Sequence, residues 1–321
     1  MIIVTGAAGF IGSYVAGELN QQGYTDLVLV DDFGRADKRP NWETKLCTER
    51  VERSQFIAWL QGKEARVQGI LHLGARTDTT DPNRGPFEEL NLAYSKALWQ
   101  YCTQHQVPFI YASSAATYGD GSLGFSDTPP NSEHLQPLNP YAWSKNEFDK
   151  WVLSQKESPF FWAGLKFFNV YGPNEYHKAR MASVVFHAFH QIRETGQLKL
   201  FKSHRADYGH GEQQRDFIYV RDLARVIRWL MEQRPGSGIF NLGTGQARSF
   251  NDLGRAIFAA MGLQPRIEYI DMPADLRNSY QYYTQAEMQR LRTLGYTPAF
   301  DSIEAGVQDY VQGYLQQGLY F

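Results

Sequence analysis

The stretch Ile2-Ile3-Val4-Thr5-Gly6-Ala7-Ala8-Gly9-Phe10-Ile11-Gly12 decides the fold, because it joins a short apolar run to a glycine-rich turn. The run from Ile2 to Val4 has the length and composition of a buried strand. After the glycines, apolar side chains recur every four residues at Ile11, Val15 and Leu19, as on one face of a helix. Glycines between a strand and a helix let the backbone approach a pyrophosphate at the helix N-terminus. The stretch therefore predicts a dinucleotide-binding βαβ unit, with a ligand-free glycine turn as the alternative.

The alternation of strands and helices continues along the chain. Further strands are expected at the apolar runs Leu27 to Val30, Ile70 to Leu73, Phe109 to Ala112 and Phe161 to Phe168. Asn241 to Gly245 repeats a strand-to-turn pattern, and Ser249 is placed to cap a helix that contains Leu253, Ile257 and Met261. The pattern predicts an α/β protein with a Rossmann-type doubly wound parallel sheet and a smaller C-terminal α/β substrate domain.

The length of 321 residues suits either two domains or one large α/β domain with an appendage. We expect the nucleotide-binding domain to span residues 1-170, with 215-245 returning to it. The substrate domain would then comprise residues 171-214 and 246-321. The stretch from Pro173 to about Gln214 has a less regular pattern and is rich in His, Arg and Lys.

The composition excludes several classes of protein. Hydrophobic residues make up 43%, and 32 Lys and Arg nearly balance 34 Asp and Glu, so we expect a globular protein rather than a cationic nucleic-acid binder. We find neither a signal peptide nor an apolar run of about 18 residues, so we expect a cytoplasmic protein without a membrane span. Cys47 and Cys102 form no C-x-x-C pair, and His204 and His210 lack neighbouring ligands, so we expect no metal site.

Asp31 follows the second expected strand, where a carboxylate in dinucleotide-binding folds accepts hydrogen bonds from the adenosine ribose. Taken alone, this residue favours NAD. Arg35, Lys38 and Arg39 come directly afterwards, and such cations can hold the 2′-phosphate of NADP. They are equally consistent with solvated loop charges. The residues alone therefore leave the choice between NADP and NAD open.

Asn139-Pro140-Tyr141 has the sequence of a helix start, with an N-cap residue and a first-turn proline. Tyr141 and Lys145 then share one helical face. A nearby ammonium favours the phenolate, so we expect a lowered Tyr141 pKa and a proton acceptor for a substrate hydroxyl. Tyr-x-x-x-Lys alone is common on helical surfaces. Together with Ser113-Ser114 after a strand and with the glycine turn, it indicates a catalytic pair.

With these motifs the chain resembles the extended short-chain dehydrogenase/reductases, whose pattern is G-x-x-G-x-x-G, a Ser or Thr after a strand, and Tyr-x-x-x-Lys. Further segments resemble the ADP-glyceromanno-heptose 6-epimerase family within that group: Ala112 to Gly119, Phe168 to Pro173, His177-Lys178, Met181 to Val184, Arg215 to Phe217 and Asn241 to Gly245. This resemblance covers most of the chain. It implies an epimerase that interconverts ADP-D-glycero-D-manno-heptose and ADP-L-glycero-D-manno-heptose for the inner core of lipopolysaccharide. It also implies bound NADP and a cytoplasmic homo-oligomer, which is a pentamer in the best known relatives.

The resemblance implies roles for individual residues. Tyr141 and Lys178 would be the two acid/bases, Lys145 would hold the cofactor ribose and tune Tyr141, and Ser114 would hydrogen-bond the reacting oxygen. The residues implied to bind the cofactor are Gly6, Gly9, Phe10, Ile11, Gly12, Asp31, Asp32, Lys38, Arg53, Leu73, Gly74, Ala75, Arg76, Thr77, Asn91 and Lys145. Those implied to bind the substrate are Ser114, Asn169, Arg180, His187, Phe201, Lys202, Ser203, His204, Arg215 and Tyr280.

Two features depart from the family pattern. Arg180 stands where relatives have Ser, and the loop from His204 to Gln214 is several residues longer. We therefore expect different contacts to the diphosphate or adenine of the substrate. Basic residues gather in and beside this loop, and a diphosphate is the simplest anion for them: Lys199, Lys202, His204, Arg205, His210 and Arg215.

The chemistry can also be argued without the family. A carbon that bears a hydroxyl but no acidic C–H is difficult to invert by proton abstraction, whereas hydride removal gives a carbonyl that can be reduced from either face. Returning the hydride to the opposite face needs either rotation of the carbonyl or a second acid/base, for which Lys178 is the candidate. On the residues alone, a phosphate-contacting or surface lysine explains Lys178 better.

Three alternatives were considered. A nucleotide-sugar 4,6-dehydratase or decarboxylase is disfavoured because Ala115 and Ala116 stand where elimination needs an acidic residue. A UDP-hexose 4-epimerase uses the same Ser, Tyr and Lys but usually has no second lysine, and it stays open. From another class, a non-catalytic NADP-binding regulatory protein also stays open, although such proteins commonly lose the Tyr and Lys pair.

Overall fold

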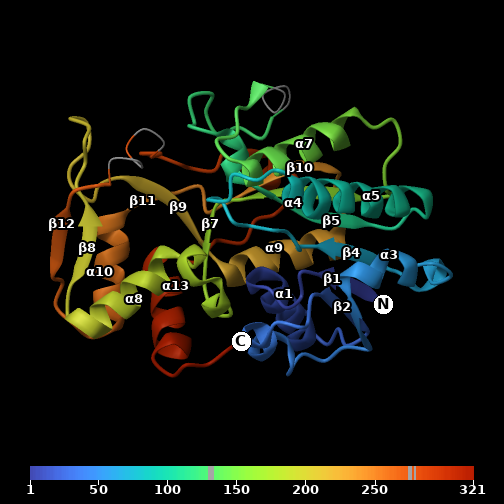
Figure 1. Ribbon diagram of the computed structural model, residues 1–321, viewed down its shortest axis with the longest axis horizontal. Helices are drawn as coiled ribbons and strands as arrows, with labels where there is room; N and C mark the ends of the chain where they lie inside the picture. The colour runs from blue at the N-terminus through green and yellow to red at the C-terminus, as the bar shows by residue number, and fades with distance from the viewer. Residues whose placement is uncertain (129–133, 274–276, 278–279) are drawn as a thin grey trace.

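A seven-stranded sheet forms the centre of the computed structural model, which describes residues 1–128, 134–273, 277 and 280–321 (Figure 1). Its strand order is β10-β6-β5-β4-β1-β2-β3, and every neighbouring pair is parallel. The strands are β1 (Ile2–Thr5), β2 (Leu27–Asp31), β3 (Glu49–Glu52), β4 (Gly69–His72), β5 (Phe109–Ser114), β6 (Trp162–Phe167) and β10 (Gly238–Leu242). The strands expected from the sequence are confirmed.

Alternate side chains of this sheet enter two separate hydrophobic cores, because successive residues of a strand point to opposite faces. Ile2 and Val4 of β1 belong to the core that contains α1 (Phe10–Gln21) and α9 (Val220–Gln233). Ile3 belongs to the other core, with α5 (Tyr94–Gln104) and α7 (Pro140–Ser154). Figure 1 shows the two helix pairs on opposite faces of the sheet. The predicted doubly wound α/β fold is therefore confirmed.

The topology places a binding site at the glycine turn. From β1 the chain runs outward to β2 and β3, and then crosses back to β4 on the other side of β1. The strand order thus reverses between β1 and β4, and open α/β sheets bind ligands at such a switch point, beyond the carboxyl ends of the strands. The glycine turn follows β1 at this point.

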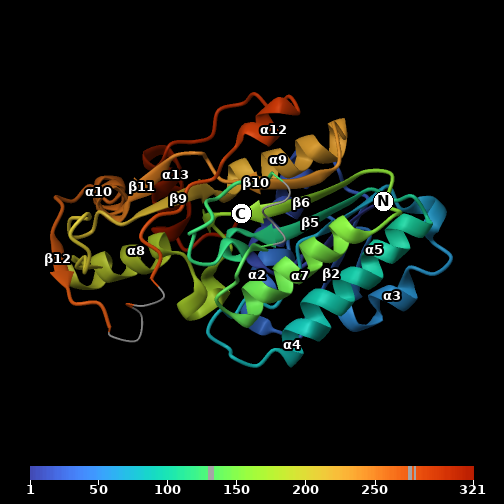
Figure 2. The ribbon, with the colours of Figure 1, turned by 90° about the horizontal axis from the view of Figure 1, so that it is seen from above.

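A smaller group of elements lies at one end of the molecule (Figure 2). It contains a three-stranded sheet with the order β11-β9-β7 and a parallel pair, β12 and β8. The strands are β7 (Asn169–Tyr171), β8 (Leu198–Phe201), β9 (Gln214–Tyr219), β11 (Ala247–Ser249) and β12 (Ile267–Ile270). The helices are α8 (Val184–Thr195), α10 (Phe250–Ala260) and α13 (Ile303–Tyr310).

The chain passes between these two parts more than once. The strand β9 pairs with β7 and β11, whereas the following helix α9 packs against α1 and β10 completes the seven-stranded sheet. The division into residues 1-170 with 215-245 and residues 171-214 with 246-321 stays a prediction.

The stretch from Pro173 to Gln214, whose sequence pattern is less regular, contains the helix α8 and the strand β8. Helical spacing is present in this stretch: Val185, Ala188, Phe189 and Ile192 are buried along one face. Ser183 caps the helix by accepting a hydrogen bond from the Phe186 backbone N–H at 3.3 Å. The many His and Arg residues occupy the other face of α8 and obscured the pattern.

The remaining helical segments are short. They are α2 (Arg39–Trp42), α3 (Phe56–Trp59), α4 (Gly85–Phe87), α12 (Gln289–Thr293) and the 3-10 or π turns η1 (Ala36–Lys38), η2 (Arg53–Gln55), η3 (Glu64–Arg66), η4 (Glu88–Ala93), η5 (Ala115–Tyr118), η6 (Tyr176–Met181) and η7 (Val311–Leu315).

Candidate active site

The glycine turn makes contacts that leave no room for side chains. Gly6 has φ +72°, and a Cβ there would lie 2.5 Å from the Cα of Gly74 in the loop after β4. A Cβ on Gly12 would lie 2.1 Å from the Gly6 carbonyl oxygen. Gly9 caps α1 without a side-chain hydrogen bond, so no side chain covers the N–H groups of the first turn. This cradle fits a dinucleotide pyrophosphate, which needs close backbone approach and helix N–H donors.

Asp31 ends β2 and is held by the glycine turn itself. One carboxylate oxygen accepts a hydrogen bond from the Ala8 backbone N–H at 2.9 Å, and the other accepts one from Lys38 Nζ at 3.2 Å. Asp32 is exposed, and its side chain accepts from the Gly34 N–H at 3.1 Å. Arg53 is half-buried just after β3. Asp31 and Lys38 are therefore paired with each other at the edge of the cradle.

Asn91 fixes the loop after β4. Its side-chain oxygen accepts a hydrogen bond from the Arg76 N–H at 2.8 Å, and its Nδ2 donates to the Arg76 carbonyl at 3.0 Å and to Ser144 Oγ on α7 at 3.0 Å. Asn91 is buried in the π-turn η4, a distortion that often marks functional positions. Ile11, Leu73 and Ala75 are half-buried beside the turn, and Thr77 is exposed.

Ser114, Tyr141 and Lys145 come together at the carboxyl end of β5. Asn139 caps α7 as predicted, because its side chain accepts from the Ala142 N–H at 2.9 Å. Tyr141 lies in the first turn of this helix, and the Ser114 side chain is near enough to its hydroxyl to influence its pKa. Lys145 is buried and donates from Nζ to the Ala112 carbonyl oxygen at 2.8 Å.

The protonation of this trio is set mainly by burial. Burial raises the pKa of Tyr141, the neighbouring Ser114 side chain opposes the rise, and the charge of Asp149 adds to it. Burial lowers the pKa of Lys145 to about 8, against the opposing charge of Asp149. The expected lowering of the Tyr141 pKa is therefore wrong for this structure. The desolvation of the phenolate dominates, and the Lys145 ammonium is directed at a carbonyl oxygen instead.

Lys178 reaches the glycine turn from another part of the chain. Its Nζ lies 5.2 Å from the centroid of the Phe10 ring. Burial lowers the pKa of Lys178, and the charge of the fully buried Glu175 opposes this change. The next residue, Ala179, has φ +47° and ψ −128°, a conformation that is costly for a residue with a side chain. The segment thus stores strain beside the candidate acid/base.

Asn41 ties the Lys178 segment to the glycine turn. Its Nδ2 donates to the Ala8 carbonyl at 3.0 Å and to the Asn174 carbonyl at 3.1 Å, and it lies 3.2 Å from His177 Nδ1. Asn41 has no exposed surface. Burial lowers the pKa of His177 to about 4, with Lys38 adding to the effect, so this ring is neutral at pH 7. Asn41 and Glu175 carry no sequence motif and were missed for that reason.

Phe201, Arg215 and Tyr280 form a second group in the smaller part of the molecule. The buried Arg215 guanidinium lies 5.2 Å from the Tyr280 ring centroid and donates to the carbonyl oxygens of Gln214 and Gln281. The Phe201 and Tyr280 rings meet edge to face with centroids 6.3 Å apart. Burial lowers the Arg215 pKa, and nearby tyrosines oppose the change. A buried guanidinium among aromatic rings suits a planar or anionic ligand group.

The other expected substrate residues are more exposed. Arg180 contacts Asp78 and Thr80 in the loop after β4. Lys202 pairs with Asp271 at 3.3 Å. Ser203 donates from Oγ to the Arg205 carbonyl at 2.9 Å, while the His204 N–H donates to the Tyr282 hydroxyl at 3.0 Å. The side chains of two further residues are exposed, without a described contact to the groups above: Asn169 and His187.

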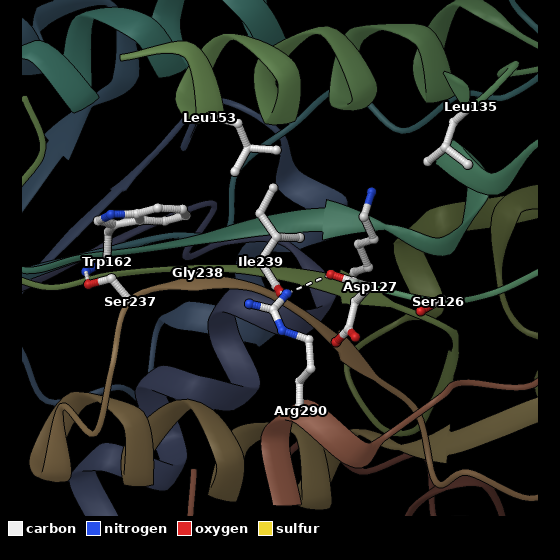
Figure 3. A pocket seen from close by; sticks show the side chains of 10 residues that line it. Ser126, Asp127, Leu135, Leu153, Trp162, Ser237, Gly238, Ile239 and Arg290 are labelled. Carbon is white, nitrogen blue, oxygen red and sulfur yellow. Dashed lines mark hydrogen bonds between the residues drawn. The ribbon is translucent and has the colours of Figure 1, made fainter. Parts of the chain in front are cut away.

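A cavity of about 190 Å³ lies away from these residues, between α7, β10 and α12 (Figure 3). Apolar side chains such as Leu153 and Trp162 line one part of it. Arg290 reaches across it and donates to the carbonyl oxygens of Asp127 and Ile239 at 2.5 and 2.6 Å. The cavity contains none of the expected site residues.

Among the residues that the structure describes, no three His, Cys, Asp or Glu side chains are grouped to hold a metal ion. No helix formed by these residues combines the length and apolar character that crossing a bilayer requires.

A glycine cradle at the switch point of a parallel sheet, with a Ser, Tyr and Lys trio at its edge, defines a Rossmann-type dinucleotide-binding enzyme. The chain belongs to the NAD dependent epimerase/dehydratase family, whose family model matches residues 2–243. A curated relative from Fusobacterium nucleatum, ADP-L-glycero-D-manno-heptose-6-epimerase, is 44% identical, and the alignment covers 98% of each chain.

Solved structures agree with this assignment. The ADP-L-glycero-D-manno-heptose-6-epimerase of Helicobacter pylori superimposes with a TM-score of 0.81 at 29% identity, covering 97% of this chain and 95% of the other. A complex of MoeE5 with UDP-glucuronic acid and NAD matches with a TM-score of 0.76 at 25% identity over 99% of both chains. The family and its relatives thus support a nicotinamide dinucleotide as cofactor.

Proposed function

We propose that the chain interconverts ADP-D-glycero-D-manno-heptose and ADP-L-glycero-D-manno-heptose by transient oxidation at carbon 6. The observation that carries this proposal is the 44% identity, over 98% of both chains, to a relative with this activity in its name. The UDP-hexose 4-epimerase and regulatory alternatives have no comparable support.

The cofactor in this proposal is NADP, bound at the glycine cradle. Gly6, Gly9 and Gly12 would admit the pyrophosphate, and Lys38 with Arg53 would face the 2′-phosphate. When bound, the nicotinamide accepts a hydride from the substrate carbon and returns it. Asn91 supports this site by holding the loop from Leu73 to Thr77 against α7.

Tyr141 is the proton acceptor at carbon 6 in one orientation of the substrate. Ser114 would hold the reacting oxygen near the Tyr141 hydroxyl, since its side chain lies near enough to that hydroxyl to influence its pKa. Lys145 lies one helical turn further along α7, and its ammonium would stabilise the phenolate once a cofactor ribose draws it away from the Ala112 carbonyl.

Lys178 is the acid/base for the opposite orientation. Burial already lowers its pKa, which brings an ammonium closer to proton exchange near neutral pH. Its position over the Phe10 ring places it at the glycine turn, on a different segment from Tyr141. The carbonyl of the oxidised substrate must present each of its two faces to the cofactor in turn. Two acid/bases on different segments suit this, because each can serve one orientation of the carbonyl.

The ADP part of the substrate would bind at Phe201, Arg215 and Tyr280, where a guanidinium lies against aromatic rings. Arg180, Asn169, His187 and the loop residues Lys202, Ser203 and His204 would contact the diphosphate or the heptose. We further propose that the protein acts in the cytoplasm as a homo-oligomer, and we expect this oligomer to be a pentamer. Light scattering of the purified chain would give the number of subunits.

The test is to incubate the purified chain with ADP-D-glycero-D-manno-heptose and follow the configuration at carbon 6. Inversion supports the proposal. No inversion, with turnover of UDP-galactose instead, contradicts the substrate assignment. Releasing the nucleotide by denaturation and identifying it as NADP or NAD decides the cofactor in the same preparation.

A further inference from the structure

A buried ion pair lies directly behind the Ser114, Tyr141 and Lys145 trio. Asp149 on α7 has no exposed surface. Its carboxylate accepts three hydrogen bonds, from Lys166 Nζ at 2.7 Å, from Ser113 Oγ at 2.7 Å and from the Tyr111 hydroxyl at 3.0 Å. Lys166, on β6, is 1% exposed. Because each charge is removed from water, each depends on the other for compensation.

Lys166 extends this network to the far side of Ser114. Its Nζ donates to Thr117 Oγ1 at 2.7 Å, and the Thr117 hydroxyl donates to the Ser114 carbonyl at 2.8 Å. Ser113, which precedes Ser114, is bound to Asp149. The backbone on both sides of Ser114 is therefore tied to the same ion pair.

The network also fixes the helix that carries the other two members of the trio. Asp149 lies one helical turn beyond Lys145 and two turns beyond Tyr141 on α7. The carboxylate thus joins α7 to β5 through Ser113 and Tyr111, and to β6 through Lys166. This set of bonds determines how far the Tyr141 hydroxyl lies from Ser114.

Stability alone does not account for such a pair. Replacing a buried ion pair by apolar side chains of similar volume is often neutral or stabilising, whereas removing one partner is strongly destabilising. A fully satisfied polar network has another property, because its directional bonds define one geometry. That property matters most where a proton must pass between fixed groups.

We propose that the Asp149 and Lys166 ion pair is a positioning device that fixes Ser114 beside Tyr141 and balances the electric field at the Tyr141 hydroxyl. This inference rests on the proposed function, in which Tyr141 and Ser114 act at the reacting oxygen. Asp149 and Lys166 contact neither group's reacting atoms, and both act through the residues that they hold.

The charged groups around this part of α7 determine the sign of each substitution. Lys145 and Asp149 belong to the helix itself, Lys166 comes from β6, and the glutamates of η4 are exposed. The phenols of Tyr111 and Tyr118 face the pair from β5 and η5. Of the charged groups, only Asp149 and Lys166 would be removed in the test.

The experiment compares the pH profiles of kcat/KM for Lys166→Met, Asp149→Asn and the double variant. Lys166→Met leaves an uncompensated carboxylate, so the acid limb that reports Tyr141 should move to higher pH. Asp149→Asn leaves an uncompensated ammonium, so the limb should move to lower pH. We expect each single variant to shift the acid limb by about one pH unit, as is typical when one nearby charge is left uncompensated. The double variant retains neither charge, so its limb should return to the wild-type position.

The same variants should lose kcat about tenfold or more while the KM for the ADP-heptose changes less than twofold, because the ion pair lies away from the expected substrate contacts. Lys166→Arg keeps the charge and should recover part of the loss. If Lys166→Met does not fold, the double variant, which buries no unpaired charge, still tests the expected loss of kcat.

Asp222→Asn is the matched control, since Asp222 is an equally buried carboxylate on α9 that pairs with Arg225. It should lower thermal stability without moving the pH profile. Shifts of the same sign in both single variants, or unshifted profiles in both of them, would overturn the proposal. If the wild-type chain does not invert the heptose, the proposed function fails instead. Hydrogen exchange then still tests the positioning role: the amides of residues 114–118 should exchange faster in Lys166→Met than in Asp222→Asn.

Discussion

Lys38 Nζ donates a hydrogen bond to the Asp31 carboxylate at 3.2 Å, and both side chains are mostly buried at the carboxyl end of β2. The second oxygen of Asp31 accepts from the Ala8 N–H in the glycine turn. A free carboxylate at this position repels a 2′-phosphate, but here its charge is compensated. The pair therefore makes the adenosine end of the cradle compatible with NADP despite an aspartate that alone favours NAD.

Lys38→Ala should weaken NADP binding more than NAD binding. The change removes both the compensating charge and a donor for the phosphate, and hydrogen bonds to charged groups contribute about 1.5–3 kcal/mol, so a loss of roughly tenfold to a hundredfold is expected. Titration calorimetry with NADP and NAD on nucleotide-free protein measures the ratio. Arg39→Ala is the control, since Arg39 is exposed and pairs with Glu43. If the ratio of the NADP and NAD dissociation constants is unchanged in Lys38→Ala, Lys38 does not contact the 2′-phosphate.

Gly12→Ala should abolish dinucleotide binding and destabilise the fold. The new Cβ would lie 2.1 Å from the Gly6 carbonyl oxygen, so the turn must open by more than an ångström. Overpacking of this kind costs about 1–3 kcal/mol, and the turn would no longer match a pyrophosphate. Thermal unfolding with and without cofactor measures both effects. Gly313→Ala in η7 is the control, because a Cβ there meets its nearest atom at 3.9 Å.

The sequence predicted the nucleotide-binding half of the fold well, because its strands are continuous apolar runs and its turn needs glycine at defined positions. Asn139 and Ser249 were recognised as helix caps because capping needs particular side chains at a fixed spacing. The helix α8 was missed because its polar face carries His and Arg residues, although its buried face repeats regularly. Asn41 and Glu175 lie far from any motif, and only the tertiary fold places them at the site.

The pKa of Tyr141 shows a second limit of the sequence. The spacing of Tyr141 and Lys145 correctly indicated one helical face, but it carried no information on burial. Desolvation acts on both groups, raising the Tyr141 pKa and lowering that of Lys145. Asp149, which influences both, is unremarkable in the sequence. The electrostatics of the trio therefore depend on the elements packed around it.

His72 should make the protein less stable as the pH falls below 6.5. Its ring is bound on both sides, to Thr5 Oγ1 at 2.7 Å and Ser95 Oγ at 2.8 Å, and burial lowers its pKa to about 3. Between these values the unfolded chain takes up a proton that the folded protein does not. The free energy of unfolding should then fall by about 1.4 kcal/mol per pH unit from this group.

Comparison with His72→Gln isolates the effect, because every other titrating group is shared. The difference in unfolding free energy between wild type and variant should be constant above pH 7.5 and should shrink steadily from pH 6.5 to pH 5. Urea unfolding at each pH measures this difference. A difference that stays constant across the whole range would mean that the folded protein protonates His72 as readily as the unfolded chain does.

Tyr141→Phe and Lys178→Met should each lower kcat by about 10²–10⁴-fold, the range typical for loss of a general acid or base, while the bound nucleotide is retained. The reason is geometric: Tyr141 lies beside Ser114 at the end of β5, whereas Lys178 approaches the glycine turn from η6. Neither group can replace the other from its position.

Turnover of ADP-D-glycero-D-manno-heptose and the nucleotide released on denaturation provide the two measurements. Lys156→Met, at an exposed lysine in the turn after α7, is the matched control and should retain full activity. Full activity in Lys178→Met would leave Tyr141 as the single acid/base and would require the substrate carbonyl to rotate in front of it.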